Sequence, residues 1–590
     1  MWLHSMNSFR VRPGRHLRRQ KVRPAKTRLL LEMLEDRALP SFALGALAQV
    51  GPTDPFAGCS TAGQVGTNYP NSQVEPRVAV DPTNPAHVVG VWQQDRWSNG
   101  GAQGIVAGVS FDGGQSWTEV VIPGLTVCSG GTIQRASDPW VSIGPTGTVF
   151  ASSLAVNLDA TGQTLSSSIL VSRSTDGGLT WGPPTTLITD GPNFMDDKES
   201  ITADPHNPNL VYAVWDRNKL DDTFSFGGQA LLARSTDGGQ SWKPAAVIFQ
   251  SPSQDRNIGH QIVVLPDGTL IDAFVELPAD TLDILRSKNG GKDWSRPIVV
   301  AQEGVPDIFN PDLVPPVRVR GGDILPEVAA DPISGNLYAV WPDVSFLDPL
   351  PGTFFMHGIS GIDFTMSSDG GFTWSTPMIV NQTPTNLANP FNSQAFNPDI
   401  AVGANGIVAV SYSDFRFNDS NPGVPTDDWV AFGNPSGPGG LTNLANWGNE
   451  LRITATSFNM ENAPLANGEL FLGDYQGLAA AGSGFEAFFA EAGSSPQTAS
   501  VFSRQILDPP AGPAGVLVTA QEIPAAAPAP GPRGRTTPPA RHRSPPVDAV
   551  LSSLASARAR DVVFAASHAT ANDEGVRLFA PLSSGSLDAM

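Results

Sequence analysis

The chain has 590 residues, enough for a large core or several domains, and its 60 Gly and 53 Pro follow no collagen-like period. Its formal net charge is −20. Residues 1–28 hold nine Lys or Arg and no acid, so the remaining 27 basic and 56 acidic side chains give a balance of −29. Such an acidic body repels nucleic-acid phosphates, and no run of 18 apolar residues is present to form a transmembrane helix.

The first 41 residues form a basic segment that differs from an ordinary signal peptide. Its apolar stretch at Leu29–Leu31 is short, and acids follow at once in Leu-Glu-Met-Leu-Glu-Asp-Arg, residues 31–37. With Pro40 and Ser41, this run resembles a signature that opens many large exported or surface proteins of certain bacteria. The resemblance predicts a bacterial secreted or cell-surface protein. The alternative is a disordered basic arm that binds acidic surfaces.

Only two cysteines occur, Cys59 and Cys128, on either side of the first repeat described below. In an oxidising compartment they are able to pair, which would tie the N-terminal segment to the rest of the chain. Neither has a His or Cys neighbour at metal-ligand spacing, so we expect no zinc site.

An octet, Ser-x-Asp-Gly-Gly-x-x-Trp, recurs along the chain and predicts a repeat architecture. Four copies keep the acid and a fifth replaces it with Asn; the third residues are Asp112, Asp176, Asp237, Asn289 and Asp369. The acid is suited to accept hydrogen bonds from its own turn, and the glycines supply positive φ. The Trp places a ring where neighbouring sheets meet, which explains five of the 13 tryptophans.

These octets resemble the Asp-boxes of sialidase-type (BNR) repeats, a resemblance that implies an all-β propeller. Each octet follows an apolar strand, a turn and a second strand, so four strands make one blade. Residues 42–508 would form the propeller. Seven strand starts favour seven blades, with six, as in sialidases, the alternative; they lie near Glu75, Asp138, Lys198, Gly259, Pro326, Asn397 and Gly473. A strand from 42–50 or 501–507 would complete the last blade.

Beyond residue 508 the composition changes. Residues 509–547 are rich in Pro and Ala and predict a flexible or polyproline-type linker. Residues 548–590 form a tail with at most one short helix, for which Asp548 is the expected N-cap.

Propellers bind ligands at the mouth of the central channel, where the inner strands begin. Alignment of the repeats predicts one residue per blade at that mouth: Arg77, Trp140, Glu199, His260, Glu327, Asp399 and Tyr475. Polar side chains at the start of apolar strands require a reason, because unpaired burial costs several kcal/mol. The alternative to a binding site is a water-filled rim in which these groups stay hydrated.

The sialidase resemblance also implies roles for particular residues. That chemistry uses three arginines for a carboxylate, a Tyr nucleophile activated by a Glu, and an Asp acid/base. Tyr475 resembles the nucleophile, Asp95 the acid/base and Arg77 the first arginine, with Glu199 or Glu327 to activate the tyrosine. Asp95 also has a structural alternative, a repeated blade corner, because Asp-Arg recurs at 216–217.

The sequence departs from the sialidase pattern where the other two arginines should stand. His260 and Glu327 occupy the mouth positions of blades four and five, and Arg318 and Arg320 are off-register. A rim rich in Asp and Glu would repel the carboxylate of sialic acid.

Three functions therefore stay open. The first is a retaining sialidase-like exo-glycosidase that acts through Tyr475, Asp95 and Arg77. The second is a glycosidase or lyase for another sugar that uses Glu199 and Glu327. The third is a non-catalytic, monomeric surface propeller that binds glycan or protein, requiring no cofactor beyond a possible Ca²⁺ at its acidic rim, with Trp140, His260 and Asp399 among the binding residues.

Overall fold

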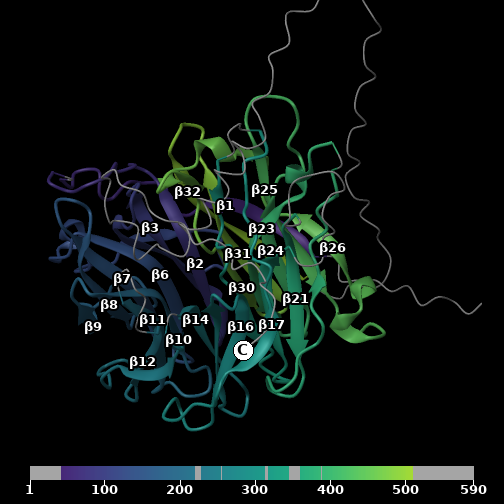
Figure 1. Ribbon diagram of the computed structural model, residues 1–590, viewed down its shortest axis with the longest axis horizontal. Helices are drawn as coiled ribbons and strands as arrows, with labels where there is room; N and C mark the ends of the chain where they lie inside the picture. Colours follow the sequence, from purple (N-terminus) through teal and green to yellow (C-terminus); the bar gives the residue numbers. More distant parts are fainter. Residues whose placement is uncertain are drawn as a thin grey trace, which may run out of the picture. The chain divides into compact units, whose positions relative to one another are not determined.

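A computed structural model of the chain describes residues 42–508 except 61, 220–226, 254, 313–316, 345–358 and 387. The segments predicted for 1–41, 509–547 and 548–590 lie outside the described residues. The described part is all-β, built from antiparallel sheets, as the sequence predicted (Figure 1). None of its helices has the length and apolar character to cross a membrane.

The first sheet group joins two sets of four strands that follow each other in the chain. The first set is β2 (Gln73–Asp81), β3 (Asn84–Arg96), β4 (Ala102–Ser110) and β5 (Thr118–Val121). The second set is β6 (Arg135–Ile143), β7 (Val149–Leu158), β8 (Thr164–Ser174) and β9 (Thr185–Asp190). A single pairing, Ala102 with Ala136, links β4 to β6 and makes one continuous sheet.

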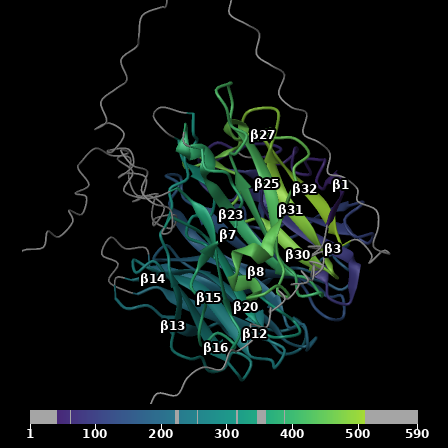
Figure 2. The same cartoon turned by 90° about the vertical axis from the view of Figure 1, so that its right-hand side faces the viewer.

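Four further sheets repeat the same antiparallel order (Figure 2). The third set is β10 (Phe194–Ala203), β11 (Val211–Lys219), β12 (Gln229–Ser235) and β13 (Ala246–Gln250). The fourth is β14 (Arg256–Val264), β15 (Leu270–Leu277), β16 (Thr281–Ser287) and β17 (Ile298–Gln302). The fifth is β19 (Glu327–Ala330), β20 (Leu337–Asp343), β21 (Gly361–Ser367) and β22 (Met378–Ile379). The sixth is β23 (Ala395–Val402), β24 (Val408–Asp414), β25 (Pro425–Gly433) and β26 (Trp447–Arg452), with β27 (Phe458–Asn459) beside β25.

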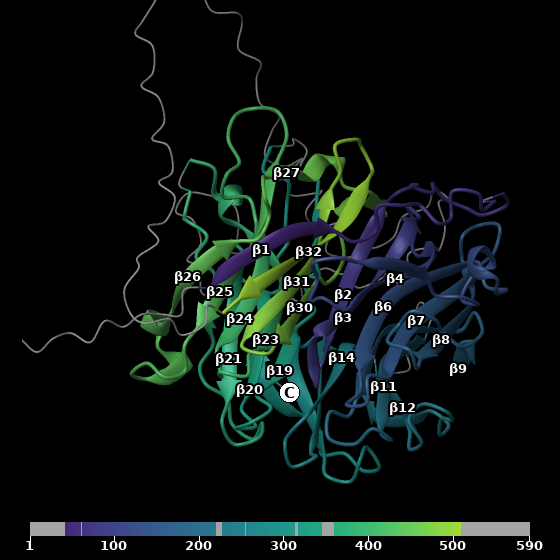
Figure 3. The same ribbon diagram turned by 180° about the vertical axis from the view of Figure 1, so that it is seen from behind.

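The last set combines both ends of the described chain. Its strands are β30 (Gly477–Ala481), β31 (Gly484–Ala492), β32 (Ala499–Leu507) and β1 (Ala43–Gln49). β1 pairs antiparallel with β32, as Figure 3 shows, so the two strands proposed from sequence as alternatives are both used. Phe42, just before β1, stacks on Phe432 of the sixth sheet with ring centroids 4.3 Å apart.

The first strands of successive sets contact one another along the chain, in the order β2, β6, β10, β14, β19, β23 and β30. β30 then contacts β2, which closes the series. Apolar side chains fill the space between neighbouring sheets; one such cluster combines Val89 and Ile105 with Val149 and Trp181.

A small sheet and five short 3-10 helices lie in the connections. The sheet consists of β18 (Val319–Arg320), β29 (Glu469–Phe471) and β28 (Leu465–Ala466), with β18 parallel to β29. The helices are η1 (Val127–Ser129), η2 (Pro390–Ser393), η3 (Gly440–Thr442), η4 (Leu444–Asn446) and η5 (Met460–Asn462).

The octets form the turns between the third and fourth strands of five sets. In the third octet Asp237 accepts hydrogen bonds from Ser235 Oγ at 2.8 Å and the Ser241 N–H at 2.9 Å. In the second, Gly178 has φ +96°, and a Cβ there would lie 3.0 Å from Val109 of the preceding set. The octet glycine therefore supplies both the backbone conformation and the close approach between sheets.

The structure pairs Cys59 with Cys128, the pairing that the sequence allowed, with Cα atoms 5.6 Å apart. This bond ties the segment after β1 to η1 beside the first sheet. A disulfide is typical of proteins that fold in an oxidising compartment.

Candidate functional site

The predicted mouth residues lie where the first strands bulge. Glu75, Asp138, Lys198 and Asn397 adopt left-handed backbone at φ 53°, 50°, 47° and 54°, and Gly259 does so at 76°. Each bulge shifts the strand register, and pairing resumes two residues later. A left-handed non-glycine residue costs about 1–2 kcal/mol, so its side chain must make compensating contacts.

Those contacts form the central ion cluster, which we define as Glu75, Asp138, Lys198, Arg320 and Asp474. Lys198 Nζ lies 2.5 Å from Asp474, 3.5 Å from Asp138 and 3.8 Å from Glu75. Arg320, on β18, binds Asp474 with two nitrogens, Nε at 2.7 Å. The cluster therefore carries its own cations and is electrostatically compensated from within.

Beside the cluster, five predicted mouth residues come together. Arg77 binds Glu327 at 3.0 Å and Asp399 at 3.2 Å, and its guanidinium lies 3.8 Å from the centre of the Trp140 ring. Trp140 packs edge-on against Tyr475, with ring centroids 5.4 Å apart. The Tyr475 hydroxyl donates to the Pro139 carbonyl at 3.1 Å. The structure thus brings these five of the seven predicted residues together.

Two predicted mouth residues are displaced by one position. Pairing after the bulge resumes at Arg77, Trp140 and Asp399, and the equivalent residues in the third and fourth sets are Ser200 and Gln261. Because side chains alternate along a strand, the residues predicted there, Glu199 and His260, point to the other face. In those two sets the predicted residue lies one position before the one at which pairing resumes, although the same bulge occurs in the first, second and sixth sets.

His260 is fully buried and has structural partners. Its ring nitrogens lie 2.9 Å from Asp272 and 3.0 Å from Asn257, and the ring stacks on Phe274. We therefore do not keep it among the ligand-binding residues.

The acids near Tyr475 are buried, which sets their protonation. Burial raises the pKa of Glu75 to about 8, with Asp138 adding to the rise, and burial likewise raises the pKa of Glu327 to about 8 against the opposing charge of Arg77. Burial also raises the pKa of Glu199 well above its usual range, and neither of its oxygens has a hydrogen-bond partner. The pKa of Tyr475 is raised by burial and by the charges of Glu75, Asp138 and Glu199. A raised pKa makes the phenol a poorer nucleophile.

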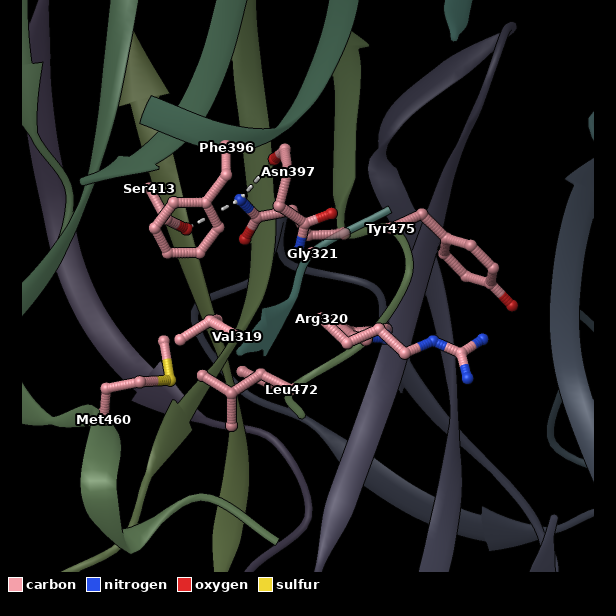
Figure 4. A pocket seen from close by; sticks show the side chains of 13 residues that line it. Val319, Arg320, Gly321, Phe396, Asn397, Ser413, Met460, Leu472 and Tyr475 are labelled. Carbon is pink, nitrogen blue, oxygen red and sulfur yellow. Dashed lines mark hydrogen bonds between the residues drawn. The ribbon is translucent and has the colours of Figure 1, made fainter. Parts of the chain in front are cut away.

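One cavity that Tyr475 lines is small. The cavity that Tyr475, Arg320, Phe396 and Met460 line has a volume of about 10 Å³, roughly the space of one water molecule (Figure 4). The connection that carries β18 contributes to its wall. Tyr475 is 4% exposed and Glu327 is 2% exposed, whereas Arg77 and Trp140 are partly exposed.

Asp95 lies apart from Tyr475, in a larger cleft that we call the Asp95 cleft. The cleft has a volume of about 480 Å³, and its polar walls come from β3, β4 and the segment after β1. The lining side chains include Asp54, Gln64, Asn68, Asp95, Trp97 and Gln103. Cys59 of the disulfide also lines it, so the cross-link fixes one wall.

Two buried polar atoms at the Asp95 cleft lack a partner in the protein. Asp95 is 1% exposed and Trp97 2% exposed, yet Asp95 Oδ2 and Trp97 Nε1 make no hydrogen bond. The other oxygen, Asp95 Oδ1, accepts from the Asn71 N–H and from Gln94 Nε2, each at 3.0 Å. Burial raises the pKa of Asp95 to about 7, and the neighbouring Asp54 carboxyl adds to the rise. Unpaired buried polar atoms on a cleft wall are suited to meet a polar ligand.

The remaining site expectations concern metal. Across the described ranges no group of three His, Cys, Asp or Glu side chains is arranged to hold a metal ion. At the acidic centre Lys198 and Arg320 bind Asp474, and Arg77 binds Glu327 and Asp399, so the Ca²⁺ site stays a prediction that no contact supports.

Comparison with known proteins gives structural likenesses only. No family model and no curated protein matches the chain. Solved structures similar to it include the Hadza microbial sialidase Hz136, at 15% identity and a TM-score of 0.38, covering 59% of this chain and 64%, under two thirds, of that one. The intramolecular trans-sialidase from Ruminococcus gnavus is 14% identical, with a TM-score of 0.40, over 79% of this chain and 99% of the other. The α-L-arabinofuranosidase Arb93A from Fusarium graminearum is 13% identical, with a TM-score of 0.38, over 59% and 91%. Likenesses of this size assign no activity to this chain.

Proposed function

We propose that the chain is an exported, seven-bladed Asp-box propeller that binds a glycan in the Asp95 cleft. The closed series of contacts between first strands and the octet turns support the propeller, one blade for each four-stranded set. The disulfide and the signature-like N-terminal run support export.

The observation that supports the Asp95 cleft as the binding site is its volume compared with that of the cavity beside Tyr475. The cavity beside Tyr475 has room for about one water molecule, whereas the Asp95 cleft, of about 480 Å³, has the size typical of small-ligand sites. The cleft also presents amide, indole and carboxyl groups, which are the partners that sugar hydroxyl groups use.

A glycan array followed by calorimetry of the best binder tests this proposal. Trp97→Phe replaces the indole with a smaller phenyl ring that has no N–H, and it should weaken binding about tenfold, since a buried donor to a ligand hydroxyl contributes about 1–1.5 kcal/mol. The matched control, Trp140→Phe, changes the same group at the centre and should leave affinity within twofold. If Trp140→Phe abolishes binding and Trp97→Phe does not, the ligand binds at the centre and the proposal is wrong.

The second candidate is the sialidase-like hydrolase with Tyr475 as nucleophile. The observation in its favour is that Arg77 and Arg320 both lie around Tyr475. However, Arg77 is bound by Glu327 and Asp399, and Arg320 by Asp474, so neither is free for a substrate carboxylate. We expect no turnover of a fluorogenic sialoside; turnover that Tyr475→Phe abolishes would favour this candidate instead.

A further inference from the structure

The disulfide beside the Asp95 cleft joins two parts of the chain that are held very differently. Cys59 lies on the cleft wall, and Cys128 lies in η1. Both cysteines are half-buried, and Gly58 and Ser60 on either side of Cys59 are exposed. The bond therefore lies near the surface, where a thiolate in solvent is able to approach it.

Cys128 is anchored on its own side of the bond. The residue before η1, Thr126, is fully buried, and its hydroxyl donates to the backbone carbonyl of Gln103 on β4. The first residue of η1, Val127, donates its N–H to the Ile133 carbonyl at 2.8 Å. These bonds hold η1 against the first sheet independently of the disulfide.

Cys59 lacks anchors of this kind. Phe56, three residues earlier, is 3% exposed and packs in the cluster that includes Val106 of β4. Beyond it the Cys59 N–H donates to the Phe56 carbonyl at 2.7 Å and the Ala57 N–H to the Asp54 carbonyl at 3.4 Å, so both bonds stay within the segment. Within the described ranges, the disulfide alone connects residues 57–60 to another element by a covalent or hydrogen bond.

The disulfide also contacts the amide groups of the cleft. Cys128 Sγ lies 3.2 Å from Gln103 Oε1. Gln103 Nε2 donates to Asn68 Oδ1 at 2.9 Å, and Asn68 Nδ2 donates to the Asp95 carbonyl at 2.8 Å. A disulfide sulfur carries no hydrogen, so Cys128 becomes a donor to Gln103 only when the bond is reduced. The thiol that reduction leaves at Cys128 therefore has an acceptor already in place.

We propose that this disulfide is a redox switch of the Asp95 cleft: reduction frees residues 57–60 from the wall and lowers the affinity for glycan. The inference rests on the proposed glycan binding and adds its regulation. A dithiol in solvent supplies two electrons and two protons: the S–S bond breaks, each cysteine sulfur gains one hydrogen, and the dithiol closes into its own disulfide. Ala57 and Cys59 then leave the wall, whereas Gln103 and Asn68 stay in place and the sheets keep their fold.

Hydrogen exchange read by mass spectrometry tests the release of the wall without any ligand. The full chain is compared before and after treatment with dithiothreitol, and a thiol titration shows whether both cysteines are reduced. Peptides from residues 51–63 should exchange about tenfold faster after reduction, while peptides from β14 to β17 should stay within about twofold. Cys59→Ser combined with Cys128→Ser should show the same pattern without the reductant. Faster exchange throughout the chain, unchanged exchange at 51–63 in the reduced protein, or a bond that the dithiol fails to reduce in the folded chain would each overturn the inference.

Calorimetry with the saccharide that the glycan array selects measures the effect on binding. Its affinity should fall about tenfold on reduction and return on reoxidation. The double serine variant is the matched control, since its affinity should already be low and should not respond to dithiothreitol. Equal affinity of the reduced and oxidised protein would overturn the inference and leave glycan binding in place. Binding of no saccharide by either form would overturn the proposed glycan binding and with it the effect on affinity, and the exchange measurement distinguishes this failure from a wall that reduction does not release.

Discussion

At the scale of single residues, the octet acid acts as a local acceptor that holds its turn together. In the fifth octet Asp369 Oδ1 accepts from the Phe372 and Thr373 N–H groups at 3.0 and 2.9 Å, and Oδ2 accepts from Thr373 Oγ1 at 2.7 Å. In the fourth octet an Asn stands in place of the Asp, and the hydrogen bonds to the backbone are kept: Asn289 Oδ1 accepts from two backbone N–H groups. The backbone bonds therefore need an oxygen at this position, and the charge adds to them.

Asp369→Ala should lower the free energy of unfolding by about 1–2 kcal/mol, the typical cost of losing a side chain that caps backbone donors. Asp369→Asn should cost less than half of that. The hydroxyl and backbone donors of Thr373 lower the pKa of Asp369 to about 2, so its contribution is present above pH 4 and lost as the pH falls toward 2. Urea denaturation at pH 7 and pH 3 measures both effects; an alanine variant as stable as the parent at pH 7 would refute the role.

The sequence predicted the octet turns, whose motif is local. It did not predict the register of strands in which a bulge interrupts the two-residue alternation of side chains. The octets predicted their turns because the Ser, Asp and two Gly residues that form each turn lie within eight residues of one another. In the third and fourth sets the predicted mouth residue lies one position before the one at which pairing resumes; a bulge such as those at Lys198 and Gly259 inserts a residue without any periodic signal, so the alignment had nothing to fix its register there. The role of Arg320 was missed, because it comes from a connection whose path only the folded chain defines.

At the scale of strands, the sequence predicted most elements of each set, because two apolar strands and an octet recur in order. The last set had no octet, and its completion depended on a partner from the other end of the chain. β1 supplies that partner by pairing with β32, and Phe42 beside it packs on Phe432 and Phe485. The join between the sixth and last sets is therefore partly made by the segment that begins the described chain.

Phe42→Ala should lower the free energy of unfolding by about 3–4 kcal/mol, as expected for an aromatic ring removed from a core. The matched control is Leu507→Ala, on β32 opposite Ala43, where the side chain is 45% exposed and the change should cost under about 1 kcal/mol. Urea unfolding followed by tryptophan fluorescence measures both. Equal effects of the two substitutions would mean that β1 adds little to the closure.

At the scale of the whole molecule, many buried acids favour their protonated form. Burial raises the pKa to about 8 for acids in several different sets: Glu75, Asp197, Glu327, Asp363, Glu450 and Glu486. A carboxyl whose pKa is raised by folding stabilises the folded state fully below about pH 4, and this contribution is lost as the pH rises through 8. The octet acids act in the opposite sense, but only below about pH 4.

We therefore expect the urea midpoint to be higher at pH 5 than at pH 8.5. Asp363 offers a direct test, since burial and the neighbouring Asp343 raise its pKa and neither of its oxygens has a partner. Asp363→Asn should stabilise the protein by about 1–3 kcal/mol at pH 8.5 and change it little at pH 5. Asp419→Asn, at an exposed acid, should have no effect at either pH. A midpoint independent of pH would contradict the expectation.

The pairing of β1 with β32 also has a consequence in time. The ribosome makes Gln49 long before Ala499, and the 450 residues between these positions take roughly 20 to 90 s to synthesise at 5–20 residues per second. Throughout that interval β1 lacks β32, the strand with which it pairs in the structure. If the chain crosses a membrane before it folds, the last strand to emerge on the far side is also the one that allows the first to dock. Pairing of β1 with β32 would then mark the arrival of all the described sheets.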